Sequence, residues 1–175
     1  LAFHLVFQSE EKTLTDKDRL SKALEVVFTC GRRTDNLKSM YHAMTEKLIV
    51  LGDALPGIAG SVSDIGVQKS WLTQKDLEIE DALSEVILKG DPEAQIYAEE
   101  KHGVLLEAKS LWIIDPISNT FNFIHGLPHY SLVVSHRYEG VVLFAAIYDP
   151  ATKELFTATK GKGAFLNGKP MRVSQ

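Results

Sequence analysis

The sequence predicts an α+β fold, a layered sandwich in which N-terminal helices pack on a mostly antiparallel sheet. Between residues 35 and 90, two segments repeat apolar residues every three or four positions, which is the period of an amphipathic helix. After residue 95 the pattern changes to short β-forming runs separated by turn residues. Helices and strands are thus segregated along the chain, and this order favours α+β over repeated βαβ units.

Both helices are predicted from residues on one face and from end signals. The first follows a polar break over residues 31–36 and places these residues on one face: Leu37, Met40, Tyr41, Met44, Leu48 and Leu51. A loop is expected over residues 53–67. The second helix starts at the capping-box-like Thr73 to Asp76 and stops at Gly90-Asp91-Pro92. Its expected buried stripe is Ile79, Ala82, Leu83, Val86 and Ile87.

Six short runs are predicted as strands, namely residues 95–98, 111–114, 130–138, 141–148, 154–159 and 164–166. Glu139-Gly140 is a candidate two-residue hairpin turn, and Asn167-Gly168 supplies positions suited to positive φ. Neighbouring runs joined by such short turns predict an antiparallel meander.

The composition is that of an ordinary globular chain. With 175 residues, 45% hydrophobic and 24% charged, the chain is long enough for one well-buried domain. A net charge of −4 gives no general attraction to nucleic acid or anionic lipid, so no nucleic-acid partner is predicted. A small anionic substrate would therefore need cations or a local basic group to bind.

The cellular compartment is predicted from the cysteine content and from the apolar runs of the sequence. Cys30 is the only cysteine, which fits a reducing compartment. The apolar start at residues 1–7 lacks the basic flank of a signal peptide, and no apolar run approaches the roughly 18 residues that span a bilayer. We expect a cytoplasmic protein without a membrane partner.

Residues 1–34 are predicted to form a separate strand and helix segment, with residues 35–175 as the main domain. Residues 1–8 are mostly apolar, and a helical pattern runs from Thr15 to Gly31. Residues 1–16 resemble the C-terminal, anticodon-binding domain of bacterial phenylalanyl-tRNA synthetase β chains. A grafted N-terminus and a generic strand and helix are both compatible with this resemblance.

The most informative segment is residues 112–123, which read Trp-Ile-Ile-Asp-Pro-Ile-Ser-Asn-Thr-Phe-Asn-Phe. It resembles the W-x-x-D-P-x-D-G-T-x-x-F signature of the inositol monophosphatase family. The resemblance continues through residues 125–131, 148–150, 154–158 and 160–168, and it implies a fold like the first domain of inositol monophosphatase. It also implies a magnesium-dependent hydrolase of small phosphate monoesters.

The resemblance implies a set of metal ligands. Glu99 and Asp115 match carboxylate ligands, and the carbonyl of Ile117 matches a backbone ligand. Hard oxygen ligands of this kind suit Mg²⁺. Without the family, Glu99-Glu100 reads as a solvated pair and Asp115-Pro116 as a turn that ends a strand.

The resemblance also assigns a water-orienting pair and a phosphate site. Thr120 and Asp76 match the catalytic pair, although Asp76 also reads as a residue that caps its own helix. Backbone N–H groups at Asn119 and Thr120 match the phosphate-binding turn. Asn tolerates positive φ, so the turn can survive there, but its side chain could obstruct phosphate.

Two departures from the family pattern put activity in doubt. Ser118 replaces the second aspartate, and a neutral hydroxyl brings no charge to offset nearby cations. Asn119 replaces the glycine. In addition, the family's further aspartate within a W-D-x-A-A segment, expected in a C-terminal half, is absent from this sequence.

Three hypotheses follow. The first is a phosphate monoester hydrolase with an impaired or incomplete site, and the second is a non-catalytic binding or scaffold module. The third is a hybrid chain without a selected function. A homo-oligomer is expected because an open cleft face invites self-association. The three histidines His125, His129 and His136 do not show metal-ligand spacing and are read as surface or satisfied residues.

Overall fold

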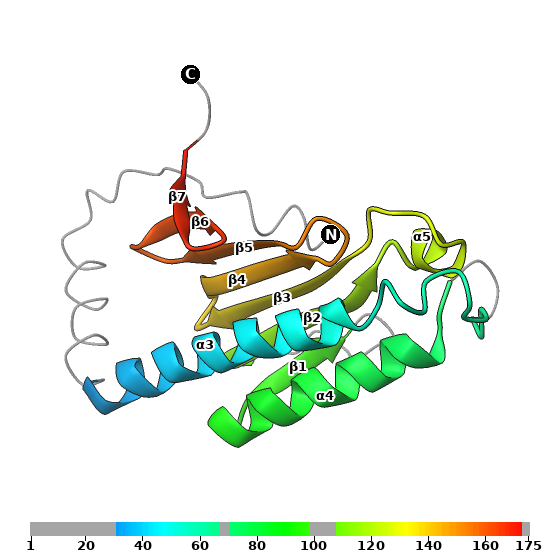
Figure 1. Cartoon of the computed structure of the whole chain (residues 1–175). Helices are drawn as coiled ribbons and strands as arrows, with labels where there is room; N and C mark the ends of the chain where they lie inside the picture. Colours follow the sequence, from blue (N-terminus) through cyan, green and yellow to red (C-terminus); the bar gives the residue numbers. More distant parts are fainter. Residues whose placement is uncertain (1–30, 67–70, 99–107, 173–175) are drawn as a thin grey trace.

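The structure is a computed structural model that describes residues 31–66, 71–98 and 108–172 of the chain (Figure 1). Two long helices, α3 (Gly31–Asp53) and α4 (Gln74–Gly90), lie side by side across one face of a sheet (Figure 1). A short helix, α5 (Thr120–Ile124), sits at one end of the sheet. The predicted α+β layers are confirmed.

In the described part of the chain, the sheet has seven strands whose spatial order is the order of the chain. They are β1 (Gln95–Ala98), β2 (Ser110–Ser118), β3 (Ser131–Tyr138), β4 (Val141–Asp149), β5 (Glu154–Thr159), β6 (Gly163–Leu166) and β7 (Lys169–Met171). All neighbouring pairs from β2 to β7 are antiparallel, whereas β1 pairs with β2 in parallel. The sheet is therefore mostly antiparallel, as predicted.

Several boundaries differ from the predictions. The polar stretch 31–36, predicted as a break, forms the start of α3, because one glycine costs a helix only about 1 kcal/mol and arginine favours helix. Strand β2 continues through Asp115 and Pro116, where the prediction without the family placed a turn. Strand β7 was not predicted.

The capping box at the start of α4 is confirmed. The Thr73 side chain accepts from the backbone N–H of Asp76, and the Asp76 carboxylate accepts from the backbone N–H of Thr73. Such a cap contributes about 1 kcal/mol to stability. It also fixes the direction in which Asp76 leaves the helix.

The hydrophobic core lies between the two long helices and the sheet. Trp112, Ile114, Leu132 and Val134 from the central strands are at most 1% exposed and face the helices. The helices contribute Met44, Leu48, Ile79, Leu83 and Ile87, all of them also at most 1% exposed. Burial of each large side chain of this kind stabilises the fold by about 1.5–3 kcal/mol.

A buried polar network crosses this core away from α5. The Tyr41 hydroxyl lies 2.8 Å from Nδ1 of His136, and Ser110 Oγ lies 3.0 Å from its Nε2. The Ser110 hydroxyl donates to Asp91 at 2.6 Å, so it accepts from Nε2 of His136, and in the neutral imidazole Nδ1 then accepts from Tyr41. The Trp112 ring stacks on the imidazole at 4.6 Å. His136 is a satisfied core residue, as predicted.

Burial raises the pKa of Tyr41, which keeps its hydroxyl protonated and able to donate.

The predictions about residues 1–30 fall outside the described residues, since the expected strand precedes Gly31 and the expected helix ends there. The proposed division between residues 34 and 35 stays a prediction. Within the described part of the chain, no helix has the length and apolar character needed to cross a membrane.

Candidate functional site

The candidate site is built where β2 ends and α5 begins. Strand β2 carries Asp115, Ile117 and Ser118, Asn119 follows as the residue before α5, and Thr120 is its first residue. Asp76 reaches the same region from the start of α4, and its side chain is fully buried. The fold thus brings Asp76 together with residues 39 to 44 positions further along the chain.

A β-bulge sets which way these side chains point. Asp115 pairs with Val133 and Ser118 with Ser131, so three steps along β2 match two steps along β3. Pro116 lies inside this interval, where it has no N–H to give to the ladder. Residues three apart on a regular strand face opposite sides. The bulge therefore puts Asp115 and Ser118 on the same face of the sheet.

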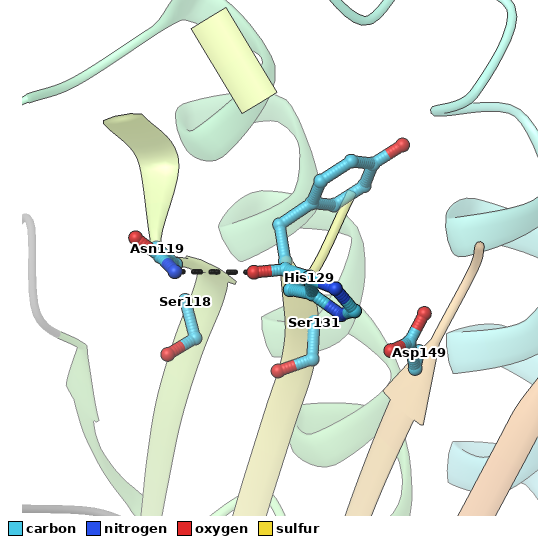
Figure 2. A pocket seen from close by; sticks show the side chains of 6 residues that line it. Ser118, Asn119, His129, Ser131 and Asp149 are labelled. Carbon is cyan, nitrogen blue, oxygen red and sulfur yellow. Dashed lines mark hydrogen bonds between the residues drawn. The ribbon is translucent and has the colours of Figure 1, made fainter. Parts of the chain in front are cut away.

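Asn119 adopts the left-handed conformation predicted for it, with φ 69° and ψ 48°. Its side-chain Nδ2 donates to the carbonyl of His129 at 3.1 Å (Figure 2). Asn122 Nδ2 donates to the same oxygen at 3.1 Å. The side chain is thereby tied to the segment that precedes β3. Asn119 preserves the turn that a glycine would make and adds a link across it.

Thr120 and Asp76 are brought together as the resemblance implied. Thr120 Oγ1 lies 3.4 Å from Asp76 Oδ1 and 2.7 Å from the carbonyl oxygen of Ile117. The hydroxyl has a single proton for these two acceptors. The contact with Asp76 is the longer one, and the hydroxyl can donate to only one of the two acceptors at a time.

The Asp76 carboxyl has an elevated pKa. Burial is the largest cause of the shift, and it outweighs the hydrogen bonds from Thr73 and Thr120 that favour the charged form. Thr73 donates through Oγ1 at 2.6 Å and through its backbone N–H at 2.8 Å. Asp76 therefore caps its helix and faces the candidate site with the same carboxyl group.

An open pocket of about 470 Å³ adjoins this turn, lined by Ser118, Asn119, His129, Tyr130, Ser131 and Asp149. Figure 2 shows Ser118, Ser131 and Asp149 coming from three neighbouring strands. The pairing of Leu132 with Tyr148 places Asp149 across from Ser131, next to the pair of Ser131 and Ser118. A row of two hydroxyls and one carboxylate thus forms the pocket wall.

Sequence reasoning missed Ser131 and Asp149 as pocket residues. It read His129 as a surface or satisfied residue, and the side chain is exposed where it lines the pocket. The available signal was the change from apolar to polar at the start of β3 and at the end of β4. Asp149 Oδ1 accepts the backbone N–H groups of Ala151 and Thr152. Burial first, and then the charge of Asp149, raise the pKa of Tyr130, so the carboxylate acts electrostatically on the pocket wall.

The described residues do not by themselves fit a magnesium ion. Across residues 31–66, 71–98 and 108–172, no three or more His, Cys, Asp or Glu side chains gather in a way that could hold a metal. The predicted ligand Glu99 lies outside the described residues. The carbonyl of Ile117 accepts the Thr120 hydroxyl, and Ser118 offers a neutral oxygen. Asp115 is then the one predicted carboxylate ligand inside the described ranges.

Comparison with known proteins decides the family. The chain matches the inositol monophosphatase family over residues 42–175. The chain belongs to this family. The match begins after the predicted boundary at residue 34 and includes α4, β2 and α5. It does not extend to the N-terminal residues that resemble a tRNA synthetase.

Relatives of known name agree with this assignment. The chain is 31% identical over 140 residues to the inositol-1-monophosphatase of Rhizobium meliloti (strain 1021), covering 77% of this chain and 53% of that protein. It is 39% identical over 111 residues to the Nus factor SuhB of Pseudomonas aeruginosa, covering 61% of this chain and 40% of that protein. The chain therefore spans about half the length of the relatives it matches or somewhat less.

A solved structure shows the same fold. The inositol monophosphatase of Thermotoga maritima superposes with a TM-score of 0.68 at 35% identity, covering 75% of this chain and 52% of that one. The layered α+β arrangement of this inositol-monophosphatase-family domain is thus shared with a solved relative. The family and fold implied by residues 112–123 are both confirmed.

Proposed function

We propose that this domain binds a small phosphate monoester beside the end of β2 and hydrolyses it slowly or not at all. The observation that carries the proposal is the contact of Thr120 with Asp76, 3.4 Å between two elements that are 44 residues apart. A buried acid and a hydroxyl meet beside the turn of Asn119, while the carboxylate expected at Ser118 is missing. The pair of Thr120 and Asp76 that would direct a water molecule is retained, whereas the metal ligand expected at position 118 is replaced by a serine.

In the proposed mechanism Thr120 orients the attacking water. When its proton points to Asp76 or to the Ile117 carbonyl, the hydroxyl oxygen can accept a hydrogen bond from a water molecule. Asp76 holds the hydroxyl in that orientation. Backbone N–H groups at Asn119 and Thr120 are proposed to bind the phosphate.

Magnesium is proposed as the cofactor, with Glu99, Asp115 and the Ile117 carbonyl as ligands. A bound cation would supply charge to offset the phosphate and would acidify a water molecule. Ser118 should weaken this binding strongly, because a neutral hydroxyl replaces a charged ligand. Asp149 adds a negative charge to the pocket, which opposes an anionic substrate when cations bind weakly.

The alternative is a non-catalytic binding or scaffold module. Ser118 favours this reading, because losing a metal ligand removes chemistry while leaving the fold and the pocket intact. One relative is named as a Nus factor and not as a phosphatase, so a binding role is compatible with the family. A hybrid chain without a selected function is a third possibility. Cytoplasmic location and self-association stay predictions from the sequence.

The test is phosphate release from inositol monophosphate and from an aryl phosphate, with magnesium or manganese. Wild type is compared with the double variant Ser118→Asp, Asn119→Gly. We expect the double variant to be at least about tenfold faster, since even outer partners of metal ligands change affinity or activity by 10–100-fold. Adding Thr120→Val to the double variant is the matched control and should abolish the gain.

Three results would contradict the proposal. Wild-type turnover near that of the double variant would show that Ser118 does not impair the site. Absence of turnover in both proteins would favour the binding module. A gain that survives Thr120→Val would contradict the role assigned to Thr120.

A further inference from the structure

Helix α5 cannot hold its own position. It is five residues long, from Thr120 to Ile124, and helices this short are not stable without outside contacts because the first turn is costly to form. Thr120 is its first residue. The position of the Thr120 hydroxyl therefore depends on what holds α5 against the rest of the domain.

One restraint is a backbone contact between two glycines. The N–H of Gly60 donates to the carbonyl of Phe123 at 2.9 Å. A Cβ added to Gly60 would lie 3.2 Å from Cα of Gly126, and a Cβ added to Gly126 would lie 3.3 Å from Cα of Gly60. Side chains at these positions would push the two segments apart. The end of α5 is thereby held against the connection between α3 and α4.

The second restraint is an aromatic cluster, defined as Trp71, Phe121 and His125. The Trp71 ring lies 5.2 Å from Phe121 and 5.8 Å from His125, both close to edge-to-face, and Phe121 lies 4.2 Å from His125. Such geometries are the favoured ones for aromatic pairs. Trp71 comes two residues before Thr73, which caps α4. The cluster therefore joins the start of α4 to α5.

Burial in the core does not explain this cluster. Trp71 is 44% exposed and Phe121 is 40% exposed, and neither belongs to the hydrophobic core. The cluster joins the same two elements as the hydrogen bond from Thr120 to Asp76. That bond is 3.4 Å long, near the outer limit for a hydrogen bond, so a small displacement of α5 would break it.

We propose that the aromatic cluster of Trp71, Phe121 and His125 is a positioning element of the candidate site, which keeps the Thr120 hydroxyl within reach of Asp76. The residues of the cluster act through Thr120 and are not assigned contacts with substrate. The inference rests on the proposed function for the role of the Thr120 and Asp76 pair. The geometric claim itself concerns only the distance between α4 and α5.

The test is a double-mutant cycle followed by urea unfolding of the whole chain. Thr120→Val removes the hydroxyl with little change in shape, and Trp71→Ala removes the ring. If the cluster holds the contact, Thr120→Val shifts the unfolding midpoint at least about twofold less in the Trp71→Ala background than in wild type, since coupled residues are not additive. Trp71→Phe, which retains an aromatic ring, should restore the full effect of Thr120→Val.

Val141→Ala is the matched control. Val141 is 39% exposed on β4, a degree of exposure close to that of Trp71. In this background Thr120→Val should act as it does in wild type. Additive effects of Trp71→Ala and Thr120→Val would overturn the proposal and reduce the cluster to a surface contact. Coupling in the Val141→Ala background equal to that with Trp71→Ala would overturn it as well.

The cycle separates this inference from the proposed function, because unfolding needs no turnover. Suppose that Trp71→Ala and Thr120→Val are coupled in unfolding, while the Ser118→Asp, Asn119→Gly variant releases no phosphate. That result would support the positioning role of the cluster and would contradict hydrolysis. If the double variant is active, adding Trp71→Ala should lower kcat by about tenfold with little change in KM. A loss confined to KM would contradict positioning of the Thr120 hydroxyl.

Discussion

The two ends of α4 each present an aspartate to a hydroxyl group, and the two arrangements differ in how completely they are satisfied. At the C-terminal end, Asp91 accepts from Ser110, which meets His136, which in turn meets Tyr41, with one proton for each link. At the N-terminal end, the Thr120 hydroxyl has one proton for both Asp76 and the Ile117 carbonyl.

This difference separates a structural network from a candidate site. A complete network in the core holds its elements in one arrangement, and removing any member leaves a buried group without its partner. A hydroxyl shared between two acceptors can change partners at low cost. The N-terminal end of α4 is therefore suited to chemistry, while the C-terminal end is suited to stability.

The largest expected effect is that of His136→Ala. This change deletes a fully buried ring that Trp112 stacks on and leaves Tyr41 and Ser110 without their buried partner. We expect a loss of about 3 kcal/mol in the free energy of unfolding, measured in urea. His42→Ala, on the exposed side of α3, is the control and should change stability by less than about 0.5 kcal/mol. Equal effects would contradict the comparison.

Tyr41→Phe should have the next largest effect. It keeps the ring that stacks on Phe144 at 4.3 Å but removes the donor to Nδ1 of His136. Leaving that buried acceptor unsatisfied should cost about 2 kcal/mol. Nitrogen NMR of the wild-type imidazole should show the neutral form protonated at Nε2. Protonation at Nδ1 would reverse the assigned direction of the network.

Thr120→Val should cost less, about 1 kcal/mol, because Asp76 keeps its two hydrogen bonds from Thr73. Urea unfolding again provides the measurement. Thr45→Val, at an exposed hydroxyl on α3, serves as the control for the loss of a threonine hydroxyl that donates to a nearby backbone carbonyl. A cost above that of Tyr41→Phe would show that the site is as tightly satisfied as the core network.

The smallest effect expected is a pH dependence from Asp76. Because its pKa is raised in the folded state, its contribution to stability is present below the unfolded value of 3.8 and is lost as pH rises through the folded value. The Asp76→Asn variant carries a neutral amide in place of the carboxyl group, so it has no titrating group at this position. Wild type should therefore lose stability relative to Asp76→Asn as pH rises from about 4 to 7. The opposite slope would show that the hydrogen bonds to the carboxylate outweigh its burial.

Local signals explain what could be predicted from the sequence. The capping box of Thr73 and Asp76, the helical spacing of α4 and the turn at Glu139-Gly140 all depend on neighbouring residues, and the structure confirms them. The contact between Thr120 and Asp76 is not local. It was implied only by the family resemblance, because no spacing rule joins residues 44 positions apart.

The features that could not be predicted from the sequence, the β-bulge and the pocket wall, depend on how the strands pair. The bulge between Asp115 and Ser118 needs the register with β3, which the apolar pattern of β2 alone does not contain. That register places Ser131 beside Ser118, and the separate register between β3 and β4 brings Asp149 into the pocket wall. The polar start of α3 suggests a break in the sequence, but one glycine costs a helix little and the arginines that follow it favour helix.

The strand order of the sheet also bears on how the site forms. Because the strands lie in chain order, each pairing closes a short segment and incurs little loop entropy. The segment that joins β2 to β3, residues 119–130, contains the turn at Asn119 and all of α5. Formation of that single hairpin therefore brings Ser118 and Ser131 together, whereas Thr120 also needs the contacts of α5 with Gly60 and Trp71.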